Sequence, residues 1–310
     1  MIAIRNRVIP GPRVVALGTF DGVHIGHRRL LETGRQLAAE EGAQLRVCTF
    51  DRHPLSVIRP GQPQELLTTL PEKLRLLAEA GAGEVRIWHF TQEMAAMPPE
   101  DFLTWLRNGT ELRGVVAGWN YSFGRGGRGT PEMLCRDGQE HGYPVAILPP
   151  VTAENGEPVS STGIREMLKQ GRTEDVRELL GRYHTLSGTV VHGKEMGHLL
   201  GFPTANVAVS REKLLPAFGV YICCLETERA VLPGIVNIGR QPTLPSGLVT
   251  VEVHVLTGSP MLYGLPVRVT LMERLRPEIR FPDLAALGKQ LAQDRREALE
   301  RFGMGEMVGK

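Results

Sequence analysis

The fold is decided by the stretch Gly18-Thr19-Phe20-Asp21-Gly22-Val23-His24-Ile25-Gly26-His27. It overlaps the end of an apolar run over residues 14–20, which predicts a buried strand. Asp21-Gly22 predicts a turn, and the residues from about Gly26 onward have the pattern of a helix. In doubly wound parallel sheets, ligands bind where a strand ends and a helix begins, because the helix N-terminus attracts anions. The stretch therefore predicts an α/β domain with a phosphate-binding edge.

Outward from this stretch, apolar runs and amphipathic segments alternate along the first half of the chain. Strands are predicted at residues 14–20, 45–50, 85–90, 115–119 and 145–148. Helices are predicted to begin near Gly26, Pro71, Pro99 and Pro131, since proline is tolerated in the first turn of a helix. Mostly unbroken apolar strands separated by helices are typical of a doubly wound parallel sheet that is covered on both faces.

After Gly181 the pattern changes to short strands of alternating polarity, separated by glycine and proline. These strands are predicted at residues 188–191, 220–225, 235–238, 249–256 and 267–271. They suggest a small antiparallel β-barrel, and a closing C-terminal helix is predicted over residues 284–302. The expected domains are therefore residues 1–182 and residues 183–310.

Composition argues against several classes of protein. The 36 Lys and Arg residues balance 34 Asp and Glu residues, for a net charge of +2, so no nucleic-acid partner is expected. No apolar run approaches membrane-spanning length, and residues 1–13 lack the apolar core of a secretory signal. We expect a cytoplasmic protein without membrane association. Its thiols are expected to be reduced, because no C-x-x-C spacing joins Cys48, Cys135, Cys223 and Cys224, and the adjacent Cys223 and Cys224 are expected to be packing residues of a strand.

His24 and His27 are the first candidate catalytic residues. They are three residues apart and share a face of the first helical turn, while Gly26 lets a nucleotide approach the backbone closely. Imidazole N–H groups aimed at a phosphate can stabilise the charge that builds up during nucleotidyl transfer. No covalent nucleophile is needed, because a second phosphate can attack directly when both are held in line. Taken alone, the two histidines could equally be surface residues or half of a metal site.

A second candidate site lies far along the same domain, at Ser160-Ser161-Thr162-Gly163-Ile164-Arg165. The stretch precedes a short predicted helix, so helix capping is the simplest explanation of its hydroxyls. The functional interpretation is that hydroxyls, backbone amides and the guanidinium of Arg165 grip the β- and γ-phosphates of a leaving pyrophosphate.

The second half of the chain contains Gly201-Phe202-Pro203-Thr204-Ala205-Asn206 between two predicted strands. Thr204 and Asn206 are two residues apart, so an extended backbone stiffened by Pro203 presents both side chains to the same side. Their oxygen atoms suit Mg²⁺ with bound ATP. A structural turn is the alternative.

A candidate base lies in the strand Val249-Thr250-Val251-Glu252-Val253-His254-Val255. Its valines share one face, and the polar residues Thr250, Glu252 and His254 share the other. A carboxylate such as Glu252 can accept the proton of an attacking hydroxyl during phosphoryl transfer. A solvated outer face would explain the polar set equally well.

Taken together, these motifs resemble the bifunctional riboflavin kinase/FAD synthetase family. Gly118-Trp119-Asn120-Tyr121-Ser122-Phe123-Gly124 is similar to a segment on the flavin side of that family's first site, with Tyr121 in place of the usual phenylalanine. Asn237-Ile238-Gly239 and Leu275-Arg276-Pro277-Glu278 flank the Glu252 strand in the order of the family's kinase domain. The resemblance covers about residues 14–302.

The resemblance implies a nucleotidyltransferase-type domain at 1–182 that adenylylates FMN to FAD with release of pyrophosphate, and a domain at 183–310 that phosphorylates riboflavin with ATP. It implies that Glu252, His24 and His27 are catalytic. The implied ATP-binding residues are Gly18, Phe20, Asp21, Gly26, Ser161, Thr162, Arg165, Gly201, Pro203, Thr204 and Asn206. Asn120 would bind the flavin, while Thr204 and Asn206 would hold Mg²⁺. The expected partners are the small-molecule substrates riboflavin, FMN and ATP, with the oligomeric state left open.

Two positions depart from the family pattern. His198 replaces an arginine before the G-F-P-T-A-N stretch, and Leu299 replaces an arginine of the last helix. Arg296 or Arg301 is a candidate substitute for that arginine. The departures leave two alternatives open, namely an FAD synthetase whose barrel only binds flavin, and a flavin-binding regulatory module without catalysis.

Overall fold

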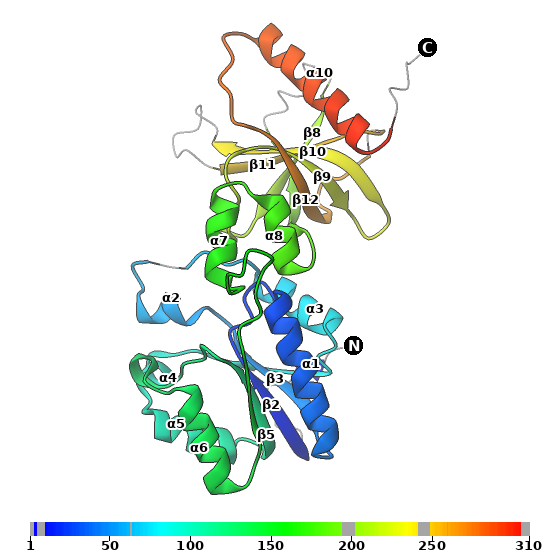
Figure 1. The fold of residues 1–310 in the computed structure, drawn as a ribbon. Coiled ribbons are helices and arrows are strands. Elements are labelled where there is room, and N and C mark those ends of the chain that lie inside the picture. The colour runs from blue at the N-terminus through cyan, green and yellow to red at the C-terminus, as the bar shows by residue number, and fades with distance from the viewer. Residues whose placement is uncertain are drawn as a thin grey trace. The chain divides into compact units, whose positions relative to one another are not determined.

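The computed structural model describes residues 3–4, 10–62, 64–193, 202–240, 249–258 and 260–304 (Figure 1). The chain divides into two compact units, Met1–Ser161 and Thr162–Lys310. This division falls earlier in the chain than the expected domain boundary at 182/183. We describe each unit by itself.

The first unit contains a six-stranded parallel sheet in the order β1-β4-β3-β2-β5-β6. Its strands are β1 (Ala3–Ile4), β2 (Pro12–Leu17), β3 (Gln44–Phe50), β4 (Glu84–Trp88), β5 (Glu111–Gly118) and β6 (Val145–Leu148). Its helices are α1 (Ile25–Glu40), α2 (Pro54–Ile58), α3 (Leu70–Glu79), α4 (Gln92–Ala96), α5 (Pro99–Asn108) and α6 (Pro131–His141), with a 3₁₀ turn η1 (Arg125–Gly127). The doubly wound parallel sheet predicted from the sequence is confirmed.

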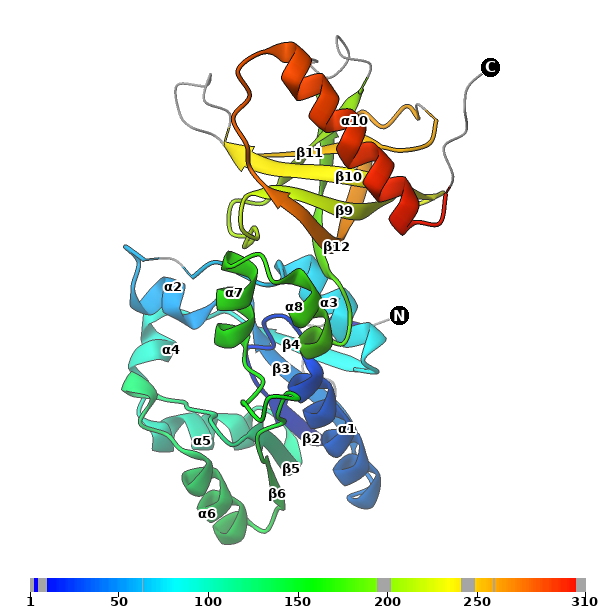
Figure 2. The same cartoon turned by 45° about the horizontal axis from the view of Figure 1, so that its top comes forward.

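Alternating residues of the central strands bury both faces of this sheet. Val14 and Ala16 of β2 pack in one cluster with side chains of α1 and α3. Val15 and Leu17 pack in another cluster with side chains of α5 and α6. Figures 1 and 2 show these two pairs of helices on opposite sides of the strands. Helices thus cover both faces of the sheet, and the candidate site lies at its carboxyl edge.

The second unit contains a closed antiparallel barrel of six strands, in the order β10-β11-β8-β7-β12-β9. The strands are β7 (His184–Val191), β8 (Thr204–Val209), β9 (Gly219–Glu226), β10 (Val231–Arg240), β11 (Val249–Val255) and β12 (Pro266–Pro277). The helices are α7 (Ser161–Lys169), α8 (Thr173–Leu180) and α10 (Leu284–Arg301). The predicted barrel and closing helix are confirmed. One difference is β8, which begins inside the stretch that was expected to connect two strands.

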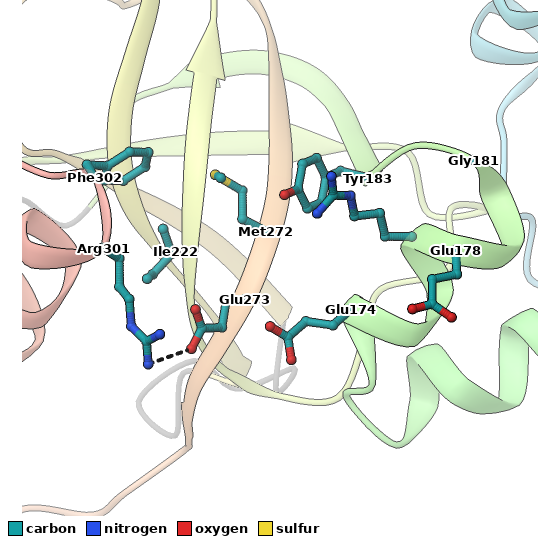
Figure 3. Close-up of a pocket in the computed structure, with 10 residues that line it drawn as sticks. Glu174, Glu178, Gly181, Tyr183, Ile222, Met272, Glu273, Arg301 and Phe302 are labelled. Carbon is teal, nitrogen blue, oxygen red and sulfur yellow. Dashed lines mark ion pairs between the residues drawn. The ribbon is translucent and has the colours of Figure 1, made fainter.

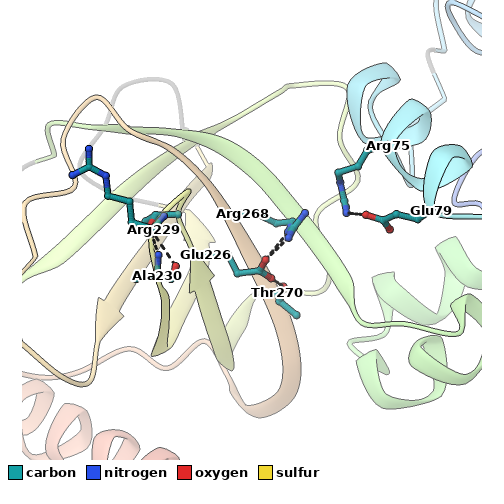
Figure 4. A network of polar contacts seen from close by, with 8 residues as sticks. Arg75, Glu79, Glu226, Arg229, Ala230, Arg268 and Thr270 are labelled. Atoms are coloured by element: carbon teal, nitrogen blue, oxygen red, sulfur yellow. Dashed lines mark hydrogen bonds and ion pairs between the residues drawn. The ribbon is translucent and has the colours of Figure 1, made fainter. Parts of the chain in front are cut away.

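The barrel is filled by alternate residues of its strands, including Val251 and Val253 of β11. Outside it, Ala298 and Leu299 of α10 pack on the outer face of β9 and β10, and Figure 2 shows α10 lying across these strands. The β9–β12 seam is also joined by polar contacts: Arg268 pairs with the carboxylate of Glu226, and Thr270 donates to the same carboxylate at 2.7 Å (Figure 4).

Candidate active sites

The loop between β2 and α1 carries the stretch that decided the fold, at the carboxyl edge of the sheet. Phe20 and Val23 adopt φ values of 52° and 40°, although neither is glycine. Both side chains are fully buried. Such conformations cost about 1–3 kcal/mol each and persist only where the surroundings hold them. The loop is therefore a strained segment that the rest of the domain must stabilise.

His24 and His27 lie together at the start of α1. His24 is the N-cap residue, and its Nδ1 accepts a hydrogen bond from the His27 backbone N–H at 3.3 Å. The two rings stack with their centroids 3.7 Å apart. A Cβ atom at Gly26 would lie 3.1 Å from the His24 ring, so glycine leaves room for this stack. Because Nδ1 of His24 accepts this hydrogen bond, the proton of the neutral ring sits on Nε2.

Asp21 anchors the loop rather than pointing its carboxylate at solvent. The carboxylate accepts hydrogen bonds from the backbone N–H of Leu67 at 3.0 Å and of Thr68 at 2.9 Å, and from the Thr68 hydroxyl at 3.0 Å. Gly18 and Phe20 also lie in this loop, and the Phe20 ring is fully buried. Any contact that Phe20 makes with ATP would therefore come from its backbone.

Lys73 of α3 holds the start of the loop through hydrogen bonds from its buried ammonium group. Its Nζ donates to the carbonyl of Phe50 at 2.8 Å and to the carbonyl of Thr19 at 3.3 Å. Burial lowers the pKa of Lys73 to about 8, against the opposing effect of the carboxylates of Asp21 and Asp51. Neither Thr68 nor Lys73 was identified from the sequence, because they are far from the loop along the chain.

The S-S-T-x-I-R stretch begins α7, where the two compact units divide. Ser161 belongs to the first unit, and its hydroxyl donates to the backbone carbonyl of Asp21 at 2.8 Å. Thr162 and Arg165 belong to the second unit, where Thr162 is exposed and Arg165 is buried. The structure thus joins the second motif to the first through Ser161.

Asn120 lies just beyond the carboxyl end of β5 and is exposed. Next to it, the Trp119 side chain is 48% exposed. The rings of Tyr121 and Phe123 stack with centroids 6.0 Å apart, and Phe123 belongs to the core beneath. This carboxyl edge thus presents aromatic surface as well as polar groups.

A row of polar side chains crosses the outer face of the barrel. Glu252 of β11 lies directly opposite Asn206 of β8 on one side and Asn237 of β10 on the other. His254 lies opposite Thr204 in the neighbouring row. The alternation predicted for β11 is therefore confirmed, with Val251 and Val253 inside the barrel. Both expected magnesium ligands and the expected base therefore lie on one surface.

His254 fixes the segment that leads into this row. Its Nδ1 lies 3.0 Å from the Pro203 carbonyl oxygen, to which it donates, and the Phe202 ring packs edge-on at 5.3 Å. Burial lowers the pKa of His254, and the charge of Arg295 lowers it further, so the neutral ring is favoured. The sequence placed His254 on the polar face but gave it no role.

Gly193 packs directly against Asn206. A Cβ atom at this glycine would lie 1.9 Å from the Asn206 amide nitrogen, so any other residue here would displace the Asn206 side chain. Gly201 and the departure at His198 lie outside the described residues. The departure at Leu299 is a packing residue, 4% exposed and held between α10 and the barrel. Arg301, one of its candidate substitutes, pairs with Glu273 at 3.1 Å.

The oxygen donors of Thr204 and Asn206 fit a hard divalent cation held together with a nucleotide, which would supply most of the remaining ligands. Among the described residues, no cluster of three His, Cys, Asp or Glu side chains could hold a metal ion alone.

A separate pocket of about 700 Å³ opens in the second unit beside α8 and the end of α10 (Figure 3). Ile222, Met272 and Phe302 line it together with the ion pair of Arg301 and Glu273. The Glu252 row is not part of its lining. This pocket is distinct from the predicted kinase residues.

Two family models match consecutive parts of the chain. The model described as FAD synthetase matches residues 7–163, and the model described as riboflavin kinase matches residues 180–302. A Bacillus subtilis protein named bifunctional riboflavin kinase/FMN adenylyltransferase is 32% identical over 297 residues, covering 93% of this chain and 92% of its own. An Escherichia coli K12 protein of the same name is 35% identical over 293 residues, covering 94% and 93%.

The chain belongs to the bifunctional riboflavin kinase/FMN adenylyltransferase family. The resemblance found in the motifs is thereby confirmed, and so is the prediction of a transferase. A solved structure described as a macrolide-efflux protein from Streptococcus pneumoniae has a TM-score of 0.85, with 29% identity and 96% coverage of both chains. That description applies to that protein, whose fold this family member shares. Within the part of the chain that the structure describes, no helix is long and apolar enough to cross a membrane.

Proposed function

We propose that this chain makes FAD from riboflavin in two successive ATP-dependent reactions, each carried by its own domain. The C-terminal part, which the riboflavin kinase model matches over residues 180–302, phosphorylates riboflavin to FMN with release of ADP. The N-terminal part, which the FAD synthetase model matches over residues 7–163, transfers AMP from ATP to FMN with release of pyrophosphate. The observation that carries the proposal is the pair of site clusters, one in each part that a family model matches. The near-neutral net charge supports small-molecule substrates rather than nucleic acid. We place the enzyme in the cytoplasm.

In the adenylyl transfer, an oxygen of the FMN phosphate attacks the α-phosphorus of ATP, and the bond to the bridging oxygen of pyrophosphate breaks. His24 and His27 would donate Nε2–H groups to the phosphate oxygens, where negative charge increases in the transition state. Gly18, Asp21 and Gly26 shape the loop so that its backbone can approach the nucleotide. Thr162 and Arg165 would hold the leaving pyrophosphate, and Asn120 would contact the flavin.

In the kinase reaction, the terminal hydroxyl oxygen of the ribityl chain attacks the γ-phosphorus, and ADP leaves. Glu252 accepts the hydroxyl proton and orients the attacking oxygen. Families of ATP-using kinases and adenylyltransferases generally need a divalent metal, and we propose Mg²⁺ here, held by Thr204 and Asn206 with ATP. When bound, it would neutralise charge on the transferred phosphoryl group. Pro203 and Gly201 would fit around the same nucleotide.

Chromatography of purified full-length protein incubated with ATP, Mg²⁺ and either riboflavin or FMN tests the proposal. We expect FMN and then FAD from riboflavin, and FAD from FMN. His27→Ala should sharply slow the formation of FAD from FMN while FMN formation stays near normal. Unchanged FAD synthesis in that variant would refute the role of the histidine pair, and no turnover of riboflavin by the wild type would leave only an FAD synthetase.

A further inference from the structure

Two buried polar residues outside every predicted motif contact the strained loop 18–24. Thr68 precedes α3 and is 4% exposed, and Lys73 lies in the first turns of α3 and is 8% exposed. Both contact the loop across the carboxyl edge of the sheet. Their side-chain hydrogen bonds go to atoms of the loop and, for Lys73, also to β3.

The Thr68 hydroxyl is used twice. It donates to the Asp21 carboxylate at 3.0 Å and accepts the backbone N–H of Gly22 at 3.0 Å. Gly22 has a φ of 84° and lies between Phe20 and Val23, the two strained residues. One hydroxyl therefore fixes the side chain before the turn and the backbone within it, which holds the turn in one conformation.

The Lys73 ammonium joins the start of the loop to the neighbouring strand. It links the carbonyl of Thr19 to that of Phe50, the last residue of β3. The charged groups that face it are the carboxylates of Asp21 and Asp51, and Asp51 is itself held by His89 at 2.5 Å. Lys73 thus fixes the other end of the loop to the sheet.

We propose that Thr68 and Lys73 are positioning residues for adenylyl transfer, which hold loop 18–24 so that the stacked His24–His27 pair faces the α-phosphate. This inference rests on the proposed function of the first domain. Thr68 acts through Asp21 and Gly22, and Lys73 acts through Thr19. A misplacement of reacting groups by about 1 Å can cost on the order of 10²-fold in rate, so loosening this loop should slow the chemical step strongly.

The test compares Thr68→Val and Thr68→Ser with Thr69→Val in the full-length protein. Valine keeps the shape of threonine but removes both hydroxyl contacts, whereas serine keeps the hydroxyl. Thr69 is the matched control, because it caps α3 in a capping box. Thr69→Val weakens the same helix without touching the loop. Kinase turnover of riboflavin in each variant reports whether the protein is intact.

We expect Thr68→Val to lower kcat for FAD formation from FMN by about 10²-fold, with KM for ATP changed less than about threefold. Thr68→Ser should recover most of the rate, and Thr69→Val should stay near the wild type. Lys73→Met should also lower kcat. Because both residues hold one loop, the double variant Thr68→Val/Lys73→Met should lose less than the product of the single losses.

Equal losses in Thr68→Val and Thr69→Val, a rise in KM for ATP at unchanged kcat, or no rescue by serine would overturn the inference. The variant His27→Ala distinguishes a failure of the positioning role from a failure of the proposed function. If His27→Ala is slow and Thr68→Val is normal, only the positioning role is wrong. If His27→Ala itself makes FAD normally, the proposed histidine chemistry is wrong.

Discussion

Glu252 of β11 lies directly opposite Asn206 of β8 on the outer face of the barrel. Directly opposed residues of antiparallel strands have Cβ atoms about 4.5–5.5 Å apart. A proposed base and a proposed metal ligand are thus fixed as neighbours by the register of two strands. The hydroxyl that Glu252 would deprotonate and the nucleotide that Asn206 would hold are brought together by the same register.

The first prediction concerns this pair. Asn206→Leu removes the proposed oxygen ligand beside Glu252. We therefore expect kcat/KM for riboflavin phosphorylation at limiting Mg²⁺ and ATP to fall by at least about tenfold, the lower range for groups that support metal sites. Ala208→Leu is the matched control, since Ala208 is exposed two residues further along β8. Steady-state kinetics check it. Equal effects of the two substitutions would mean that added bulk on β8, not the lost amide, slows the kinase.

The second prediction concerns pH and His184, the first residue of β7. His184 is 2% exposed, and its Nε2 has no hydrogen-bond partner among the described residues. Burial lowers its pKa well below the ordinary value, and the charges of Lys213 and Arg182 lower it further. The unfolded chain therefore binds a proton near pH 6.5 that the folded protein does not, so stability is lost as pH falls below about 6.5.

His184→Asn should remove this contribution, because asparagine keeps an N–H donor for the Leu214 backbone without titrating. Urea unfolding of the barrel between pH 7 and pH 5 measures it. The free energy of unfolding of the wild type should fall more steeply than that of the variant, by up to about 1.4 kcal/mol per pH unit. Parallel curves for the two proteins would show that His184 is not buried in its neutral form.

The third prediction concerns where the kinase part begins. α8 contacts β7 and β12, and the Leu168 carbonyl accepts the Ala217 N–H at 2.9 Å. Val176, Leu179 and Leu180 of α8 are buried. A fragment covering Thr162–Lys310 should therefore fold and phosphorylate riboflavin without making FAD. A fragment covering 182–310 lacks those three side chains. Its free energy of unfolding should therefore be lower by about 5 kcal/mol, which is comparable to the whole stability of many domains.

Circular dichroism and kinase assays of the two fragments check this prediction. Equal stability would show that α7 and α8 contribute nothing to the barrel and that the kinase domain begins at 183, as the sequence pattern predicts. The two family models end and begin at 163 and 180. An experiment of this kind assigns α7 and α8, which lie largely between the two matches, to one domain or the other.

Most of the architecture could be predicted because its elements carry strong local patterns. The central strands β2 and β5 contain the unbroken apolar runs 14–17 and 115–117, and α10 is long and amphipathic. The missed elements are short or weakly patterned. β1 has two residues, and α2 and α4 have five each. The strand β8 follows Pro203 and alternates with alanine, so its apolar pattern is faint.

The candidate sites were predictable where their residues belong to motifs that can be recognised in the sequence. His24 and His27 are three apart, and their stacked rings were foreseen as a shared face. Thr68 is far along the chain from Asp21, so only the folded structure shows that its hydroxyl holds that carboxylate. The fit of Gly193 against Asn206 likewise depends on tertiary packing. Contacts of this kind leave no periodic signal in the sequence.

The central claim is that two separate sites in one chain carry two separate phosphorus-transfer reactions. Glu252→Gln in the full-length protein tests it most directly, because glutamine keeps the shape and hydrogen bonding of glutamate but cannot take a proton. Both reactions are measured on one preparation, starting from riboflavin and, separately, from FMN. We predict that kcat for FMN formation falls by about 10²- to 10⁴-fold while FAD formation from FMN is unchanged. Loss of both reactions in a well-folded variant, or an unaffected kinase, would contradict the account.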